Sequence, residues 1–178
     1  MLTAERRDEV AEATWDEINL DKGLWHLPRH RTKNGREHVV HLAPAAVEIM
    51  EQLPRVPGSN FLFTTTGRRS VSGFGRARVR VAGKMRELGG GAAIEPFTLH
   101  DLRRSAATGM AEIGIAHHVV DKVLNHSSGA ISGIARIYNR NEYLAERKVA
   151  LETWARHVTG LVSPPTETEN IIEFAVAG

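Results

Sequence analysis

Apolar residues in the first quarter of the chain form short runs separated by turn-forming residues, a pattern that predicts strands. The expected strands are 15–20, 24–27 and 38–42. Asn34 and Gly35 lie between the last two, and this dipeptide favours a type I′ turn because both central positions need positive φ. The segment 15–42 is therefore predicted to form a small antiparallel three-stranded sheet, with Lys33 immediately before the hairpin turn.

Most of the remaining chain has apolar positions at helical spacing. Pro44 suits a first helical turn, and Thr98 followed by Asp101 suits an N-terminal cap. The predicted helical segments are 3–13, 44–53, 72–88, 98–113, 117–124 and 142–161. The last of these is amphipathic, with apolar positions at Leu144, Val149, Leu151, Trp154 and Val158. Helices segregated from one small sheet indicate an α+β fold that is mainly α-helical.

Length and charge narrow the class of protein. A chain of 178 residues can bury one core and form one domain. Its net charge is only +2, but three acidic residues follow Arg156 and no lysine or arginine does, so the body is more basic than the whole. A basic body attracts polyanions, although on charge alone a solvated surface is the simpler explanation. No apolar stretch is long enough to span a bilayer, and zero cysteines exclude disulfides and thiolate metal sites.

The first candidate chemistry lies at the start of the helix predicted over 98–113. His100 and Arg103 are three residues apart, so their side chains share one helix face. A guanidinium can bind two oxygens of a phosphodiester, and a histidine can donate to a third or exchange a proton. The free N–H groups of a helix N-terminus also favour an anion. The simpler alternative for this pair is a solvated surface helix.

Four further residues extend this set, and each has an ordinary explanation when taken alone. Arg6 forms an i, i+3 ion pair with Glu9, Lys33 is an exposed hairpin lysine, His126 caps or packs, and Tyr138 is a core aromatic. Taken in order along the chain, they form the set of groups that a phosphodiester site needs. The arginines and histidines can hold the phosphate and the tyrosine can attack it.

These segments together resemble the catalytic domain of the tyrosine recombinases, in particular phage and prophage integrases. The resemblance covers most of residues 2–160. The matching segments are Leu2–Val10, Arg31–His38, the His-Asp-Leu-Arg-Arg stretch from His100, the Leu-Asn-His-Ser-Ser-Gly stretch from Leu124, and Ile137-Tyr138. The fold that this resemblance implies is the integrase-type DNA breaking-rejoining catalytic domain.

The resemblance implies site-specific DNA recombination, by integration or excision, through a 3′-phosphotyrosine intermediate. Tyr138 would be the nucleophile that attacks the scissile phosphate. Arg6 and Arg103 would bind the non-bridging oxygens and stabilise the charge of the transition state. Lys33 would be the general acid that protonates the leaving 5′-oxygen.

The resemblance assigns supporting roles as well. His100 would assist proton transfer from the tyrosine, His126 would donate a hydrogen bond to the phosphate, and Glu9 would support the active-site arginine. No metal and no other cofactor is implied, because the arginines and the lysine supply the positive charge. The expected contacts to the DNA backbone come from Arg76, Arg78, Arg80 and Arg104.

The family also sets expectations for organisation. Residues 1–162 would be the catalytic domain without its first helix and without the core-binding domain, and residues 163–178 a tail that is flexible or docks on a partner. The expected partners are double-stranded DNA and further copies of the chain in a tetrameric synapse, in the cytoplasm at the nucleoid and without a membrane. Two positions depart from the family pattern, because Ala4 and Asn125 stand where glycine is usual.

Three alternatives stay open from the sequence. The chain is an inactive truncated integrase remnant that keeps the fold and weak DNA binding, or an enzyme that relaxes DNA in the manner of a type IB topoisomerase. In the third, a metal is bound by the histidines near the predicted hairpin, although their spacing matches no tight ligand pattern. These histidines are His26, His30, His38 and His41.

Overall fold

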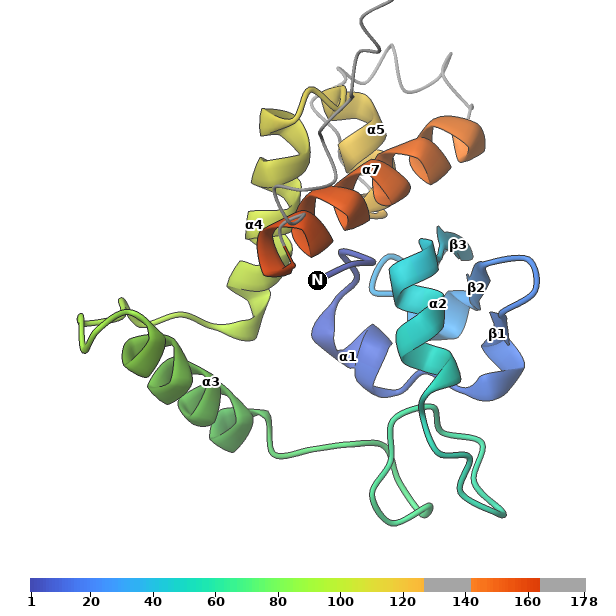
Figure 1. Cartoon of the computed structure of the whole chain (residues 1–178). Helices are drawn as coiled ribbons and strands as arrows, with labels where there is room; N and C mark the ends of the chain where they lie inside the picture. The colour runs from blue at the N-terminus through green and yellow to red at the C-terminus, as the bar shows by residue number, and fades with distance from the viewer. Residues whose placement is uncertain (127–141, 164–178) are drawn as a thin grey trace, which may run out of the picture.

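The computed structural model describes residues 1–126 and 142–163 of the chain. It confirms a mainly helical α+β fold with one small sheet (Figure 1). The helices are α1 Arg7–Ala11, α2 Pro44–Glu51, α3 Phe74–Leu88, α4 Leu99–Glu112, α5 His117–Val123 and α7 Leu144–Val162. Helix α7 packs on α4 and α5 on one side and on α2 and β3 on the other, so it joins the helical part to the sheet.

The sheet is antiparallel with strand order β1-β2-β3, as the sequence predicts. Its strands are β1 Ile18–Asn19, β2 Leu24–Leu27 and β3 His38–His41. Trp25 lies opposite Val40 in the register of β2 and β3, and both side chains are almost fully buried together with Leu27. The sheet therefore contributes the inner wall of the hydrophobic core.

The first predicted strand is too long. Residues Trp15–Glu17 form a 3₁₀ turn, and only Ile18–Asn19 pair with β2. The turn is favoured because the Glu17 carboxylate accepts the N–H of Thr14 (3.4 Å) and the indole N–H of Trp25 (3.0 Å). This capping interaction replaces the strand hydrogen bonds that a longer β1 would make.

The predicted type I′ hairpin is also wrong. Leu27 pairs with His38, so the whole of residues 28–37 connects the two strands. Pro28 lacks an N–H and a 3₁₀ turn follows it. The tip is a turn closed by the N–H of Gly35 on the carbonyl of Thr32 (3.2 Å), and Gly35 has φ of 68° whereas Asn34 does not have positive φ. Lys33 lies inside this turn rather than before it.

The helix predicted over 3–13 is limited to α1. Residues 1–6 are not helical, because Ala4 has φ of 52° and its N–H is bonded to the carbonyl of Met1 (3.1 Å). The extended Arg6 precedes the first turn and its backbone N–H donates to Glu9 Oε2 (3.1 Å). The left-handed residue before Arg6 thus turns the chain out of the helix path.

The other predicted helices are confirmed, with ends shifted by at most two residues. The cap predicted at Thr98 is present, since Thr98 Oγ1 accepts the N–H of Asp101 (3.3 Å) and the N–H of Thr98 donates to the Asp101 carboxylate (2.8 Å). In α7, Leu151 and Trp154 are buried as their spacing predicts. Leu144 and Val149 are 53% and 60% exposed, because only one side of α7 meets the core.

Helix α3 is placed unlike the rest. It stands apart from the two packed parts of the molecule, and within the described residues none of its side chains is buried (Figure 1). Its apolar positions include Val79, Val81 and Met85, all exposed. The helix therefore contributes little to the core, and most of its surface is accessible for binding.

Candidate active site

A cleft of about 520 Å³ collects three of the six predicted site residues. Arg6 lies at the start of α1, Lys33 in the turn between β2 and β3, and His100 in the first turn of α4. Arg7 and Arg78 complete a wall that is strongly basic. Segments nearly a hundred residues apart in sequence thus face one basic space.

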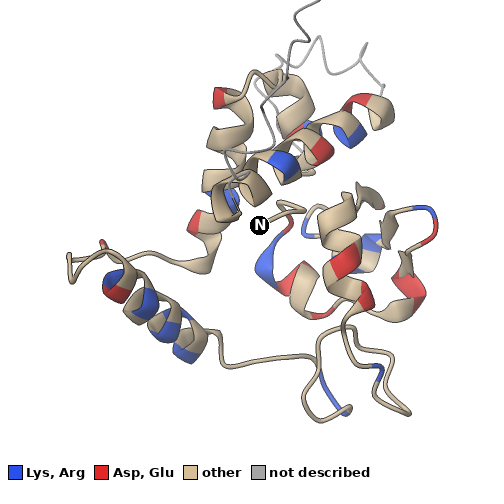
Figure 2. Cartoon of the chain, in the orientation of Figure 1, with Lys and Arg blue, Asp and Glu red and all other residues tan. Residues whose placement is uncertain are grey.

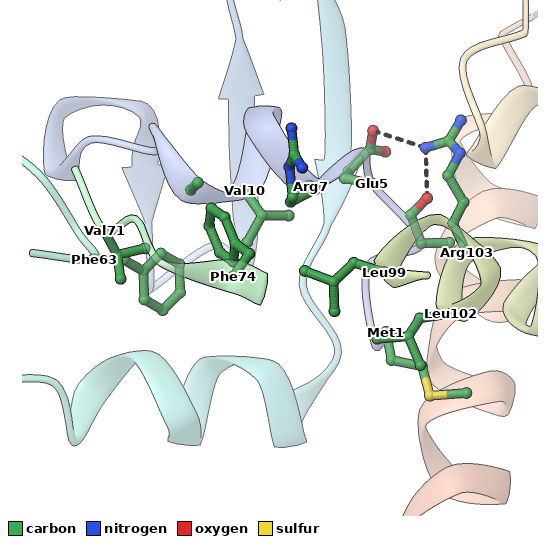
Figure 3. A pocket seen from close by; sticks show the side chains of 12 residues that line it. Met1, Glu5, Arg7, Val10, Phe63, Val71, Phe74, Leu99, Leu102 and Arg103 are labelled. Atoms are coloured by element: carbon green, nitrogen blue, oxygen red, sulfur yellow. Dashed lines mark hydrogen bonds and ion pairs between the residues drawn. The ribbon is translucent and has the colours of Figure 1, made fainter. Parts of the chain in front are cut away.

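Arg103 lies behind this cleft and is only 6% exposed. Its Nη1 donates to the carbonyl of Ala4 (2.6 Å), its Nη2 donates to the carbonyl of Leu124, and its guanidinium lies 3.6 Å from Glu5 Oε2 (Figure 3). A guanidinium carries five N–H donors, so these contacts leave donors over for a ligand. Arg103 therefore fixes the segment before Arg6 and the segment before His126 in one arrangement.

Charges in the site are close enough to affect one another. Burial lowers the pKa of Arg103, the Glu5 carboxylate opposes that change, and the positive Arg6 adds to it. Two guanidinium groups repel each other, so they are favourable neighbours only when an anion lies between or beside them. The arrangement is thus suited to a bound phosphate.

Glu9 holds Arg6 in place. The carboxylate accepts from Arg6 Nη1 (3.0 Å) and from the Arg6 backbone N–H, and the Glu9 side chain is 4% exposed. Burial acts to raise the pKa of Glu9, but interactions with Glu5 and the bonds from Arg6 outweigh it and lower the pKa overall. The ion pair expected from the i, i+3 spacing is present, with the carboxylate kept in its charged form.

His126 lies at the edge of the same group. Its Nδ1 is 3.4 Å from Asp121 Oδ1. Burial lowers the pKa of His126, the positive charges of Arg103 and Arg6 lower it further, and Asp121 opposes them. His126 is therefore an electrostatic neighbour of both arginines, as a shared anion site requires. Tyr138, the predicted nucleophile, lies outside the described residues.

Residues 1–144 of the chain match the sequence model of the Phage integrase family. This match covers most of the chain.

The chain belongs to the phage integrase family.

Two curated relatives illustrate the likeness. The prophage integrase IntA of Escherichia coli (strain K12) is 33% identical over 156 residues, which are 87% of this chain and 36% of that protein. The integrase of Enterobacteria phage P4 is 26% identical over 171 residues, which are 89% of this chain and 38% of that protein. This integrase-family chain thus spans less than two fifths of the length of either relative.

Solved structures agree on the fold. The integrase from mycobacterium phage Brujita superposes with a TM-score of 0.53 at 21% identity, over 81% of this chain and 45% of that one. XerH site-specific recombinase bound to difH substrate gives a TM-score of 0.54 at 17% identity, over 92% of this chain and 44% of that one. The architecture of the integrase catalytic domain is therefore shared.

The four arginines predicted to contact the DNA backbone lie on two helices of this integrase-family fold. Basic residues recur along the length of α3 (Figure 2). Arg76 and Arg80 are exposed, and Arg78 lines the cleft while its Nη1 donates to the carbonyl of Phe97 (2.9 Å). Arg104 on α4 is exposed and paired with Asp101 (3.0 Å). The structure thus brings only Arg78 of these four into the cleft.

The histidines near the hairpin are not gathered into a metal site. In the described ranges, no three histidine, aspartate or glutamate side chains are placed to hold one ion. His38 is buried and its Nε2 is 3.1 Å from Glu5 Oε1. Separately, no helix in the described part of the chain is long and apolar enough to cross a membrane.

The sequence analysis did not predict the burial of three charged or polar side chains. Glu5, His38 and Arg147 form a contact chain behind Arg103, with Arg147 Nη2 lying 3.3 Å from His38 Nδ1 and donating to the carbonyl of Val39. A signal for Arg147 was available, since it lies three and four residues before the buried Ala150 and Leu151 on one helix face. For Glu5 and His38, the sequence carries no such signal, and their burial is visible only in the structure.

An apolar pocket of about 230 Å³ adjoins the site (Figure 3). Phe63, Val71 and Phe74 line one end, Leu99 and Leu102 the other. Glu5 and Arg103 line it as well, so the pocket lies beside the buried part of the site.

Proposed function

We propose that this chain is the catalytic domain, residues 1–162, of a site-specific DNA recombinase that cuts and rejoins duplex DNA through Tyr138. The observation that carries the proposal is the assembly of Arg6, Lys33 and His100 around one basic cleft, with Arg103 and His126 as neighbours. Membership of the phage integrase family supports it.

In the proposed reaction, the Tyr138 oxygen attacks the phosphorus and the 5′-oxygen of the next nucleotide leaves. A new phosphorus–oxygen bond to the tyrosine forms as the bond to the 5′-oxygen breaks, so bond energy is kept for rejoining. The tyrosine proton passes to His100 and the leaving oxygen takes a proton from Lys33. Rejoining reverses both transfers.

Phosphate binding falls to the buried part of the site. Arg103 has donors left after its two backbone contacts, and Arg6 is oriented by Glu9. Fixed donors of this kind stabilise charge that develops on the non-bridging oxygens without reorganising during the reaction. His126 adds a further donor at the edge.

The proposed partner is duplex DNA, bound by four copies of the chain in a synapse. The Tn1549 transposon integrase has been solved with circular intermediate DNA, and XerH with its difH substrate. The exposed arginines of α3 supply the positive surface that such a partner requires. Residues 163–178 are proposed as a tail that docks on a neighbouring copy.

A nicked suicide substrate tests the proposal. Loss of the short 5′ fragment after cleavage prevents rejoining, so the covalent protein–DNA adduct accumulates and resists denaturing electrophoresis. We expect the adduct with the parent chain and its complete loss in Tyr138→Phe, with DNA binding kept. Binding without any adduct would instead identify a remnant that retains the fold alone.

A further inference from the structure

Two asparagines join the turn that carries Lys33 to the loop that carries His126. Asn34 Nδ2 donates to Asn125 Oδ1 (2.7 Å) and to the carbonyl of Asn125 (3.0 Å), and Asn125 Nδ2 lies 3.5 Å from Asn34 Oδ1. The pair is partly buried and its members are 91 residues apart in sequence. Each asparagine is the direct neighbour of a predicted site residue.

Both partners are fixed by their own local bonds. Asn34 Oδ1 accepts the N–H of Arg36 (3.1 Å), which braces the turn from inside. On the other side, the N–H of Asn125 donates to the carbonyl of Lys122 (3.2 Å), and the preceding carbonyl of Leu124 accepts from Arg103. The amide pair thus connects two segments that are each already ordered.

Apart from the amide pair, the side-chain bonds from the connection 28–37 to other described segments come from Arg31, before the tip, whereas Thr32 Oγ1 donates within the connection, to the carbonyls of Arg29 (3.0 Å) and Arg36 (2.7 Å). Arg31 donates to the carbonyl of Glu9 (2.6 Å) and to the Glu17 carboxylate, while the Lys33 side chain is exposed. A long connection held only at its base would leave its tip free to sample many positions. The position of Lys33 therefore depends on what holds the tip.

We propose that the Asn34–Asn125 amide pair is a clasp that positions Lys33 over the phosphate site during cleavage. The two asparagines are positioning residues and touch no reacting atom, and the proposal rests on the proposed function of Lys33. Asn125 is suited to this work because it tolerates a left-handed backbone, here φ of 48°, and also supplies an amide. Glycine, the usual residue of the family, would supply only the backbone.

Two substitutions weaken the clasp: Asn125→Gly leaves the bond from Asn34 Nδ2 to the carbonyl of residue 125, and Asn34→Asp leaves the contact made by Asn125 Nδ2. Asn125→Gly keeps the left-handed backbone and removes both side-chain contacts of that residue. Asn34→Asp keeps the acceptor for the N–H of Arg36 and removes the donor. Asn19→Asp is the matched control, because Asn19 Oδ1 accepts the N–H of Lys22 (2.9 Å) in a turn away from the cleft.

Amide hydrogen exchange in the absence of DNA measures how strongly the clasp restrains residues 28–37. We expect exchange in residues 28–37 to accelerate about three- to tenfold in Asn125→Gly and Asn34→Asp, the range that loss of one or two hydrogen bonds allows. Exchange in β2, β3 and the Asn19→Asp control should stay at the parent rate. Unchanged exchange in residues 28–37 would overturn the clasp.

Cleavage of two substrates separates positioning of Lys33 from general damage. The first has the natural 5′-oxygen at the scissile phosphate and the second has sulfur in its place. A thiol is far more acidic than an alcohol, with a pKa of about 8.5 for cysteine, so the sulfur leaves without a general acid. Lys33→Ala serves as the reference for complete loss of the acid.

We expect Asn125→Gly to slow adduct formation on the oxygen substrate about tenfold and to leave the sulfur substrate near the parent rate. Equal slowing on both substrates, or no slowing on either, would overturn the role. A parent chain that forms no adduct with either substrate refutes the proposed function and the clasp's role together. An active parent with unaffected variants refutes the clasp alone.

Discussion

Glu5 is the residue on which the interior of the site depends most directly. Its side chain has no exposed surface, Oε1 is 3.1 Å from His38 Nε2, and Oε2 faces Arg103 at 3.6 Å without a hydrogen bond of its own. Burial raises the pKa of Glu5, while His38 and Arg103 pull it down. The pKa of Glu5 is therefore set by two opposing effects, the desolvation of its charged form and the attraction of two polar neighbours.

Two substitutions of Glu5 should distinguish the contribution of its polar atoms to stability from that of its size. Glu5→Leu removes the carboxylate that faces Arg103 and leaves buried polar groups unpaired, so the free energy of unfolding should fall by about 3 kcal/mol or more. Glu5→Gln keeps an oxygen for His38 and should cost about 1 kcal/mol. Urea denaturation of both variants measures the difference, and equal stability of the two would contradict this account.

The same carboxyl gives a pH dependence with a defined sign. Because its folded pKa is above the ordinary value, the folded state binds the proton more tightly than the unfolded state. This contribution to stability is present below the unfolded pKa and is lost as pH rises through the folded pKa. Glu5→Gln should remove that loss, which denaturation at several pH values above 4.5 would detect.

The sequence predicted where His100 and Arg103 lie on their helix but not how far each is buried. The spacing of His100 and Arg103 places both on one helix face, yet His100 is exposed in the cleft while Arg103 is buried. The difference arises because the carbonyls of Ala4 and Leu124 close over Arg103. Those carbonyls come from distant segments, so no local pattern contains the information.

At the scale of elements, α4 and α7 meet at a glycine. A Cβ at Gly109 would lie 2.5 Å from Cζ3 and 2.7 Å from Cη2 of Trp154, a buried side chain of α7. The tryptophan ring therefore lies directly against the backbone of α4. The close approach of the two helices depends on the missing side chain.

Gly109→Ala should destabilise the protein although alanine is the better helix former. Overpacking costs about 1–3 kcal/mol, which exceeds the gain in helix propensity of about 1 kcal/mol. Gly83→Ala is the control, since Gly83 lies within α3 with nothing near its Cβ position, and this change should stabilise by up to about 1 kcal/mol. Thermal denaturation compares them, and a shift of the same sign in both would refute the packing argument.

Local signals predicted the helices because caps and breakers are encoded near the ends. Thr98 and Asp101 fix the start of α4, and Gly114 with φ of 88° follows its end. The β2–β3 connection was missed because Asn34 uses its side chain to reach Asn125 instead of taking the backbone of a tight turn. A competing contact from a distant segment overrode the local preference.

For the whole molecule, the distribution of charge matters more than its sum. The net charge is only +2, yet α3 carries five basic residues against one acid and borders the cleft through Arg78. The sequence predicted α3 as a basic helix, but its separation from the core is a tertiary feature that no periodicity reports. Exposed cations on a projecting helix are available to a polyanion of large extent.

Arg80→Gln should weaken duplex binding in a salt-dependent manner. Loss of one phosphate contact lowers the slope of log affinity against log salt by about 1, whatever the DNA sequence. Lys148→Gln is the control, because Lys148 lies on α7 away from the cleft and is 3.8 Å from Glu152. Fluorescence anisotropy at several salt concentrations measures the slopes, and equal slopes for parent and Arg80→Gln would exclude this phosphate contact.

The contacts of Arg103 determine which substitutions around it can be tolerated during evolution. Besides the Glu5 carboxylate, it bonds two main-chain carbonyls, at Ala4 and Leu124, and a carbonyl is present whatever side chain the residue bears. Substitutions at those two positions therefore leave the acceptors in place, within the limits set by backbone conformation and packing. A lysine at position 103 would lose the fork that reaches both carbonyls at once. Variation among descendants of this chain should thus be tolerated around the arginine and not at it.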